Sequence, residues 1–227
     1  LIPDLSAGCS LAASITAADV RELKRNYAGV PVVSYVNTTA EVKAESTICC
    51  TSANAVEVVR SLDADRVIFL PDQYLAGYVA TQTDVEIIPW PGKCEVHERF
   101  TADDIRELRS LFNGVVVLAH PECTAEVLAE ADYVGSTSGM IRRLREHPPS
   151  CAALITECAM SDNVASEMPG VRFVRPCNFC PYMRKITLPS VRRSLETLTY
   201  EITIDPAIAG PAKRAIDRML EVGRGLS

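Results

Sequence analysis

The feature that most constrains this chain is an internal repeat. Cys9, Cys94 and Cys180 lie 85 and 86 positions apart, and the segment ITAADVRELK at residues 15–24 returns as FTADDIRELR at residues 100–109. Solenoid repeats have periods of roughly 20 to 50 residues, which is too short for this spacing. A unit of this length can instead form a small domain with its own core. The sequence therefore predicts repeated domains with one such cysteine in each.

The repeat divides the chain into residues 1–93, 94–179 and 180–227. The first copy lacks a strand before its cysteine, and the third copy stops after about half a unit. We expect units related by pseudo-threefold symmetry, with the first domain incomplete. An N-terminal segment absent from the sequence shown would complete the partial third unit.

Composition indicates a globular protein without an extended nucleic-acid or membrane surface. Of 227 residues, 48% are hydrophobic and 23% charged, and no apolar run approaches the roughly 18 residues of a membrane span. The net charge of −6 disfavours nucleic acid and anionic membranes as partners. Nine cysteines and no recognisable leader peptide favour a reducing compartment, so the expected location is cytoplasmic.

Short β-branched runs alternate with helical patterns along the chain. We expect strands over residues 31–36, 47–50, 66–70, 85–88, 115–119, 133–134, 152–156, 171–174 and 201–204. We expect helices over residues 16–26, 53–62, 101–111, 137–145, 187–198 and 207–222. This alternation predicts an α/β fold of three-layer α/β/α domains with parallel sheets. Each repeated cysteine then lies on a loop after a strand, where active sites of open α/β folds are usually found.

Superposing the copies brings polar residues into matching positions. Tyr35 matches His120 and Asn37 matches Glu122, both at predicted strand ends. Hydroxyl residues match at strand-to-helix junctions, where Thr51 pairs with Ser136 and Ser52 with Thr137. Such junctions suit either an anion site or ordinary helix N-capping, and both interpretations stay open.

The repeated cysteines differ from the others in their loops. Cys9, Cys94 and Cys180 lie among small residues and prolines that give the backbone room around an inorganic group. Three thiolates can hold three irons of a 4Fe-4S cluster and leave the fourth open, although a three-cysteine zinc site is an alternative. The remaining cysteines are expected to be buried as small hydrophobic residues: Cys49, Cys50, Cys123, Cys151 and Cys158.

Six segments together resemble the quinolinate synthase family. They are residues 3–10 (PDLSAGCS), 34–43 (SYVNTTAEVK), 90–98 (WPGKCEVHE), 120–123 (HPEC), 135–138 (GSTS) and 180–183 (CPYM). The resemblance implies condensation of iminoaspartate (iminosuccinate) with dihydroxyacetone phosphate to quinolinate in NAD biosynthesis. L-aspartate oxidase is the candidate supplier of the imine.

The same resemblance implies the functional residues. One 4Fe-4S cluster per chain would be bound by Cys9, Cys94 and Cys180. The residues implied to bind substrate are Tyr35, Val36, Asn37, Ser52, His120, Pro121, Glu122, Ser136 and Thr137. Glu122 is the candidate acid/base, with His120 and Tyr35 holding substrate oxygens.

Two departures and several alternatives accompany this interpretation. The family's N-terminal His-x-Tyr motif and serine have no counterpart in the sequence shown, so an inactive truncated fragment is one alternative. Cys177 and Cys180 form a Cys-x-x-Cys pair, which is either a disulfide switch or a ligand beside a spare thiol.

His97 is either a neighbour of the cluster or a loop residue exposed to solvent. A redox-sensing iron–sulfur protein and a zinc-binding α/β domain are the rival classes, and a Rossmann dehydrogenase is disfavoured because its glycine motif is absent.

Overall fold

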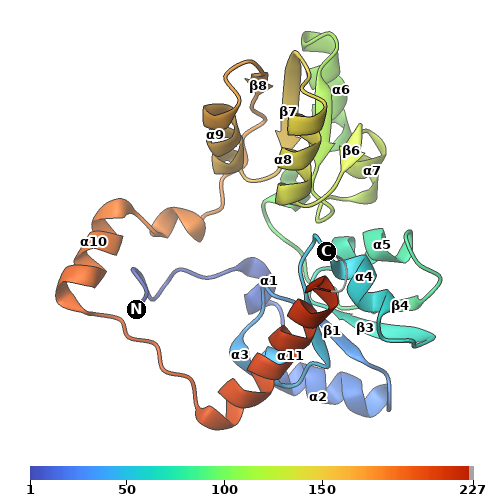
Figure 1. Cartoon of the computed structure of the whole chain (residues 1–227), viewed down its shortest axis with the longest axis vertical. Helices are drawn as coiled ribbons and strands as arrows, with labels where there is room; N and C mark the ends of the chain where they lie inside the picture. Colours follow the sequence, from blue (N-terminus) through green and yellow to red (C-terminus); the bar gives the residue numbers. More distant parts are fainter. Residues whose placement is uncertain (225–227) are drawn as a thin grey trace.

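The computed structural model, which describes residues 1–224, contains two four-stranded parallel sheets. The first has the order β2-β1-β3-β4, formed by β1 (Val32–Tyr35), β2 (Ile48–Cys50), β3 (Arg66–Leu70) and β4 (Glu86–Pro89). The second has the order β6-β5-β7-β8, formed by β5 (Val116–Ala119), β6 (Tyr133–Val134), β7 (Cys151–Ile155) and β8 (Arg172–Val174). Figure 1 shows the sheets in two separate units of the same design.

Helices join the strands and cover the sheets. The first unit contains α1 (Ser10–Ala13), α2 (Ala17–Asn26), α3 (Ala40–Ala44), α4 (Ala55–Arg60) and α5 (Gln73–Ala80). The second contains η1 (His97–Arg99), α6 (Ala102–Leu111), α7 (Ala125–Ala129), α8 (Thr137–Glu146) and α9 (Cys158–Glu167). The chain continues through η2 (Met183–Lys185), α10 (Leu188–Thr197) and α11 (Pro206–Arg224). None of these helices is both long and apolar enough to cross a bilayer.

Both faces of each sheet are buried, because successive strand side chains point to opposite sides. In the first unit, Val33 and Phe69 pack in one cluster with side chains of α4, α5 and α11. Val32 and Ile68 pack on the other face with side chains of α2 and α3. The second sheet is likewise covered by α6 and α7 on one face and by α8 and α9 on the other. The predicted α/β class with parallel sheets is therefore confirmed, and each unit has three layers.

The sequence repeat is also a repeat of local structure. A threonine N-caps an equivalent helix in all three copies, and the third residue of the helix bonds back to the threonine N–H: Thr16 with Asp19, Thr101 with Asp104, and Thr187 with Ser190. Isolated parallel bridges also recur, joining Asp72 to Gly92 and Glu157 to Asn178. These shared contacts explain why the capped helices were predictable from their spacing.

The third copy forms a different structure from the first two. Its cysteine loop, η2 and α10 follow the repeat, but residues 201–204 form no strand, so that prediction is wrong. Neither of the two sheets within residues 1–224 includes a strand from this segment. Helix α11 instead packs against α3 and β2 of the first unit (Figure 1). The threefold relation and the three domain boundaries stay predictions.

We expect Thr101→Ala to lower the free energy of unfolding by about 1 kcal/mol, as measured by urea denaturation followed by circular dichroism. The Thr101 hydroxyl accepts the N–H of Asp104, and α6 buries Ile105 in the second core. Thr187→Ala is the matched control, because the same cap begins α10, whose Leu188 and Leu195 are exposed. We expect a smaller loss there, and equal losses would contradict the proposed link between capping and packing.

Candidate functional site

The three repeated cysteines line one cavity. Cys9 is the N-cap of α1, Cys94 precedes η1 and Cys180 precedes η2, and all three border a cavity of about 460 Å³. Each is a free, partly exposed thiol. The fold therefore brings one thiol from each sequence repeat to a single site.

Polar contacts tie the three cysteine loops to one another. The Ser10 hydroxyl donates to the carbonyl oxygen of Lys93 at 3.3 Å and accepts the N–H of Glu95 at 3.2 Å. The Lys185 ammonium donates to the carbonyl oxygen of Ser6 at 2.8 Å. The first loop is thus bonded to both of the others, which limits how far the thiols can separate.

A capping carboxylate and a close backbone approach anchor the third and second loops to the sheets. Glu157 accepts the N–H of Cys180 at 3.2 Å through Oε1 and caps α9 through Oε2. In the second loop, a Cβ on Gly92 would lie 2.3 Å from the carbonyl oxygen of Pro71. Only glycine fits at this position without displacing the backbone.

Polar side chains at the strand ends complete the cavity wall. Five of the predicted substrate-binding residues line it: Tyr35, Asn37, His120, Glu122 and Thr137. Tyr35 ends β1 and His120 directly follows β5, so parallel strands of the two units deliver matching positions to one place. This agrees with the expected location of sites beyond the carboxyl ends of strands.

The other four predicted substrate-binding residues do not line the cavity: Val36, Ser52, Pro121 and Ser136. Ser52 remains connected to it, because its Oγ lies 3.1 Å from Nε2 of His120. Ser136 is the N-cap of α8 and accepts the N–H of Gly139 at 3.1 Å, which is the ordinary capping role. Its neighbour Thr137 is the hydroxyl residue of that junction that reaches the cavity.

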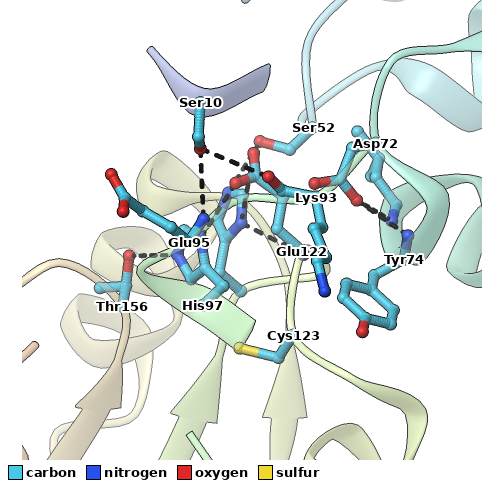
Figure 2. A network of polar contacts seen from close by, with 12 residues as sticks. Ser10, Ser52, Asp72, Tyr74, Lys93, Glu95, His97, Glu122, Cys123 and Thr156 are labelled. Atoms are coloured by element: carbon cyan, nitrogen blue, oxygen red, sulfur yellow. Dashed lines mark hydrogen bonds and ion pairs between the residues drawn. The ribbon is translucent and has the colours of Figure 1, made fainter. Parts of the chain in front are cut away.

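A buried network of imidazole and carboxylate groups lies in the cavity wall (Figure 2). Nδ1 of His97 lies 2.9 Å from Oε2 of Glu122, and its Nε2 lies 3.0 Å from the hydroxyl of Thr156. The ring of His97 stacks on that of His120 with centroids 4.7 Å apart. The sequence interpretation assigned no role to Thr156 and left His97 open. Their common signal is position, because His97 follows a repeated cysteine by three residues and Thr156 directly follows a strand.

The network sets the charge of the site. Burial raises the pKa of Glu122, but hydrogen bonds from His97 and Tyr35 and the nearby imidazoles outweigh it and hold the pKa at about 2. Burial lowers the pKa of His120 to about 4. Burial, followed by the charge of Glu122, raises the pKa of Tyr35. At neutral pH the site therefore presents a carboxylate, a neutral imidazole and a protonated phenol.

The thiols have the chemistry of metal ligands. Burial is the main cause that raises the pKa of both Cys9 and Cys94, so their thiolates need a compensating cation. Three free thiols around one cavity fit a cluster with three protein ligands. Ligand atoms of Cys94, His97 and Glu122 also lie within 4.8 Å of one another, close enough to hold a single metal ion.

Both alternatives expected for the Cys-x-x-Cys pair are wrong, since Cys177 neither pairs with Cys180 nor stays a spare thiol. Cys177 forms a disulfide with Cys158, whereas Cys180 is a free thiol. Cys158 is therefore not an unpaired hydrophobic residue, unlike the buried free thiols Cys49, Cys50, Cys123 and Cys151. The start of α9 lies against the third loop, since the N–H of Cys158 donates to the carbonyl oxygen of Asn178 at 3.1 Å. That contact brings Cys177 to Cys158.

Comparison with known proteins finds relatives that all belong to one family. The family model described as quinolinate synthetase A protein matches residues 1–221. The chain is 62% identical to quinolinate synthase 1 of Mesorhizobium japonicum over 222 residues, which cover 98% of this chain and 68% of that protein. It is 59% identical to quinolinate synthase of Agrobacterium fabrum over 222 residues, covering 98% of this chain and 64% of that protein. The chain thus spans about two thirds of the length of these relatives.

We expect a non-reducing peptide map to recover Cys158 and Cys177 as one crosslinked pair, with Cys180 alkylated by iodoacetamide. Cys177→Ser should release the Cys158 thiol and leave alkylation of Cys180 within about twofold, because Glu157 holds the Cys180 backbone independently. Mass spectrometry of the labelled peptides measures both. A crosslink between Cys177 and Cys180 would contradict this pairing.

Proposed function

Because the chain belongs to the quinolinate synthetase A family, we propose that it acts in NAD biosynthesis as a quinolinate synthase. The proposed reaction condenses iminoaspartate with dihydroxyacetone phosphate and yields quinolinate, phosphate and two molecules of water, which balances all atoms. The observation that supports it best is the shared cavity, where Cys9, Cys94 and Cys180 meet Glu122 and His120. A redox-sensing protein would need the thiols but not this carboxylate and imidazole wall.

The proposed cofactor is one 4Fe-4S cluster per chain, held by the thiolates of Cys9, Cys94 and Cys180. With three protein ligands, the cluster would supply an iron with an open coordination position that acts as a Lewis acid. The support is that all three thiols are free and border a cavity of about 460 Å³.

Glu122 is the proposed acid/base. Its carboxylate is ionised at neutral pH and only 3% exposed, so it can accept a proton from a group bound in the cavity. Formation of the aromatic ring requires protons to leave carbon and to reach departing hydroxyl groups. A single carboxylate that takes up a proton and later releases it can serve both kinds of step.

The remaining wall residues are proposed to bind the substrates. Tyr35 stays protonated and can donate to a substrate oxygen, and Asn37 adds an amide at the matching position of the first unit. Thr137 is the first residue of α8, where free N–H groups and the helix dipole favour a carboxylate or phosphate. His120 is neutral and contributes shape and hydrogen bonding rather than charge.

The proposed partners are small molecules. L-aspartate oxidase is the proposed supplier of iminoaspartate, and the cytoplasm is the proposed compartment because cluster thiolates must stay reduced.

We expect Glu122→Gln to reduce quinolinate formation by at least about 100-fold, since the amide cannot accept the proton. Visible absorbance and iron content after anaerobic reconstitution should equal those of the unaltered chain. Quinolinate is measured by chromatography. Turnover that stays normal in this variant would remove Glu122 from the mechanism.

We expect Cys9→Ser, Cys94→Ser and Cys180→Ser each to abolish cluster binding, measured as iron per chain and as the visible absorbance of the iron–sulfur cluster. Cys151→Ser is the matched control, because Cys151 is a buried free thiol in β7. It should bind as much iron as the unaltered chain. Tight stoichiometric zinc with no iron–sulfur absorbance would instead favour the zinc-binding alternative.

A further inference from the structure

The turn after β1 is held by polar side chains that its repeat partner lacks. Ser34 and Thr38 are buried hydroxyl residues, and Lys43 is a half-buried lysine in α3. At an offset of 85 residues, the second copy has two apolar side chains and a thiol at the same positions: Ala119, Cys123 and Leu128. The second unit therefore folds its turn without these polar groups, so the fold alone does not require them in the first.

Two hydroxyls converge on the last carbonyl group of β1. The hydroxyl of Thr38 donates to the carbonyl oxygen of Tyr35 at 3.0 Å. The hydroxyl of Ser34 lies 3.1 Å from that of Thr38 and 3.4 Å from the same carbonyl oxygen. Thr38 is 8% exposed and Ser34 is buried, so these bonds lie in a medium of low dielectric, where they are stronger than in water. The backbone of Tyr35 is thus fixed from inside the protein.

The lysine holds the other end of the same turn. The Lys43 ammonium donates to the carbonyl oxygen of Thr38, and the Thr38 N–H donates to the carbonyl oxygen of Val36 at 2.9 Å. In the second copy, the corresponding N–H of Cys123 donates one residue further back, to the carbonyl oxygen of His120 at 2.9 Å. The two turns therefore differ in their hydrogen bonding, although both follow a central strand at the edge of its sheet.

Asn37 is the residue that these bonds enclose. Its neighbours Val36 and Thr38 are bonded to each other, and Asn37 and Thr38 line the cavity together with Tyr35. A side chain on so short a turn changes direction whenever the backbone of the turn does. Lys43 lies outside the cavity lining, so it acts on the site through the carbonyl group of Thr38 rather than by contact with a ligand.

We propose that a polar clasp, formed by Lys43, Thr38 and Ser34, positions the substrate-binding side chains of this turn. Those side chains are Tyr35 and Asn37. This inference rests on the proposed function, because it assigns positioning residues to the substrate wall. The ammonium fixes the far side of the turn, and the hydroxyls fix the side next to the strand. Loss of either contact lets the amide of Asn37 turn away, while the cluster thiols keep their own supports.

A matched pair of variants tests the ammonium. Lys43→Met removes the donor but keeps an unbranched side chain, and Leu128→Met places the same side chain at the matching position of the second copy. In Lys43→Met we expect KM for at least one substrate to rise about tenfold, as for one lost hydrogen bond, with kcat within about threefold. Leu128→Met should keep both constants within about twofold. Equal KM values in the two variants would overturn the clasp.

A second pair of variants tests the hydroxyl half of the clasp. Thr38→Val removes the hydroxyl at similar size, whereas Thr38→Ser retains it. We expect KM to rise about tenfold in the valine variant and to stay within about twofold in the serine variant. Equal KM values in these two variants would overturn the clasp. Iron per chain after anaerobic reconstitution should match the unaltered chain in both, and loss of iron would overturn the assignment to the substrate wall.

Hydrogen exchange tests the clasp without turnover. In the full chain before cluster reconstitution, the Thr38 amide of Lys43→Met should exchange at least about tenfold faster than in the unaltered chain, because its bond to Val36 loosens. The Cys123 amide of the second turn is the internal reference and should keep its rate. An unchanged Thr38 rate would overturn the clasp, even with an altered KM. A faster Thr38 rate, together with no quinolinate from the unaltered chain, would instead reject the proposed function alone.

Discussion

The common direction of the strands is the constraint on which the site depends. Because each sheet is parallel, the carboxyl ends of its strands lie on one edge, and the residues that follow them are brought together. Tyr35 leaves β1 at this edge in the first unit, and His120 and Glu122 leave β5 in the second. The loops of Cys94 and Cys180 follow β4 and β8 at the same edges. Antiparallel neighbours would have divided these residues between opposite ends of each sheet.

Burial gives the cavity its chemistry and also makes it costly to build. Desolvation disfavours the thiolates of Cys9 and Cys94, and it would disfavour the Glu122 carboxylate without its hydrogen bonds. Hydrogen bonds from His97 and Tyr35 offset this cost at Glu122, and contacts such as Ser10 with Lys93 and Glu157 with Cys180 hold the loops together. The contacts that hold the loops together are therefore the same ones that keep the functional groups within reach of each other.

Most of the fold could be predicted where a local pattern carried the information. The capped helices α2, α6 and α10 begin within a residue of the predicted positions, because a threonine cap and its partner are close in sequence. Helix α5 was missed, since Gln73–Ala80 is apolar on nearly every side and shows no helical periodicity. The strand expected over residues 201–204 failed for a different reason, because a strand exists only when another strand pairs with it.

The sequence by itself determined the repeat, the three cysteines at equivalent positions and the polar residues at the strand ends. These features depend on spacing along the chain, which the parallel α/β pattern converts into position at a sheet edge. Only the tertiary structure decided that Cys177 pairs with Cys158 rather than Cys180, and that Thr156 reaches His97 and thereby Glu122. Those contacts join residues from separate segments, and their distances follow from how loops pack across units rather than from any periodic pattern.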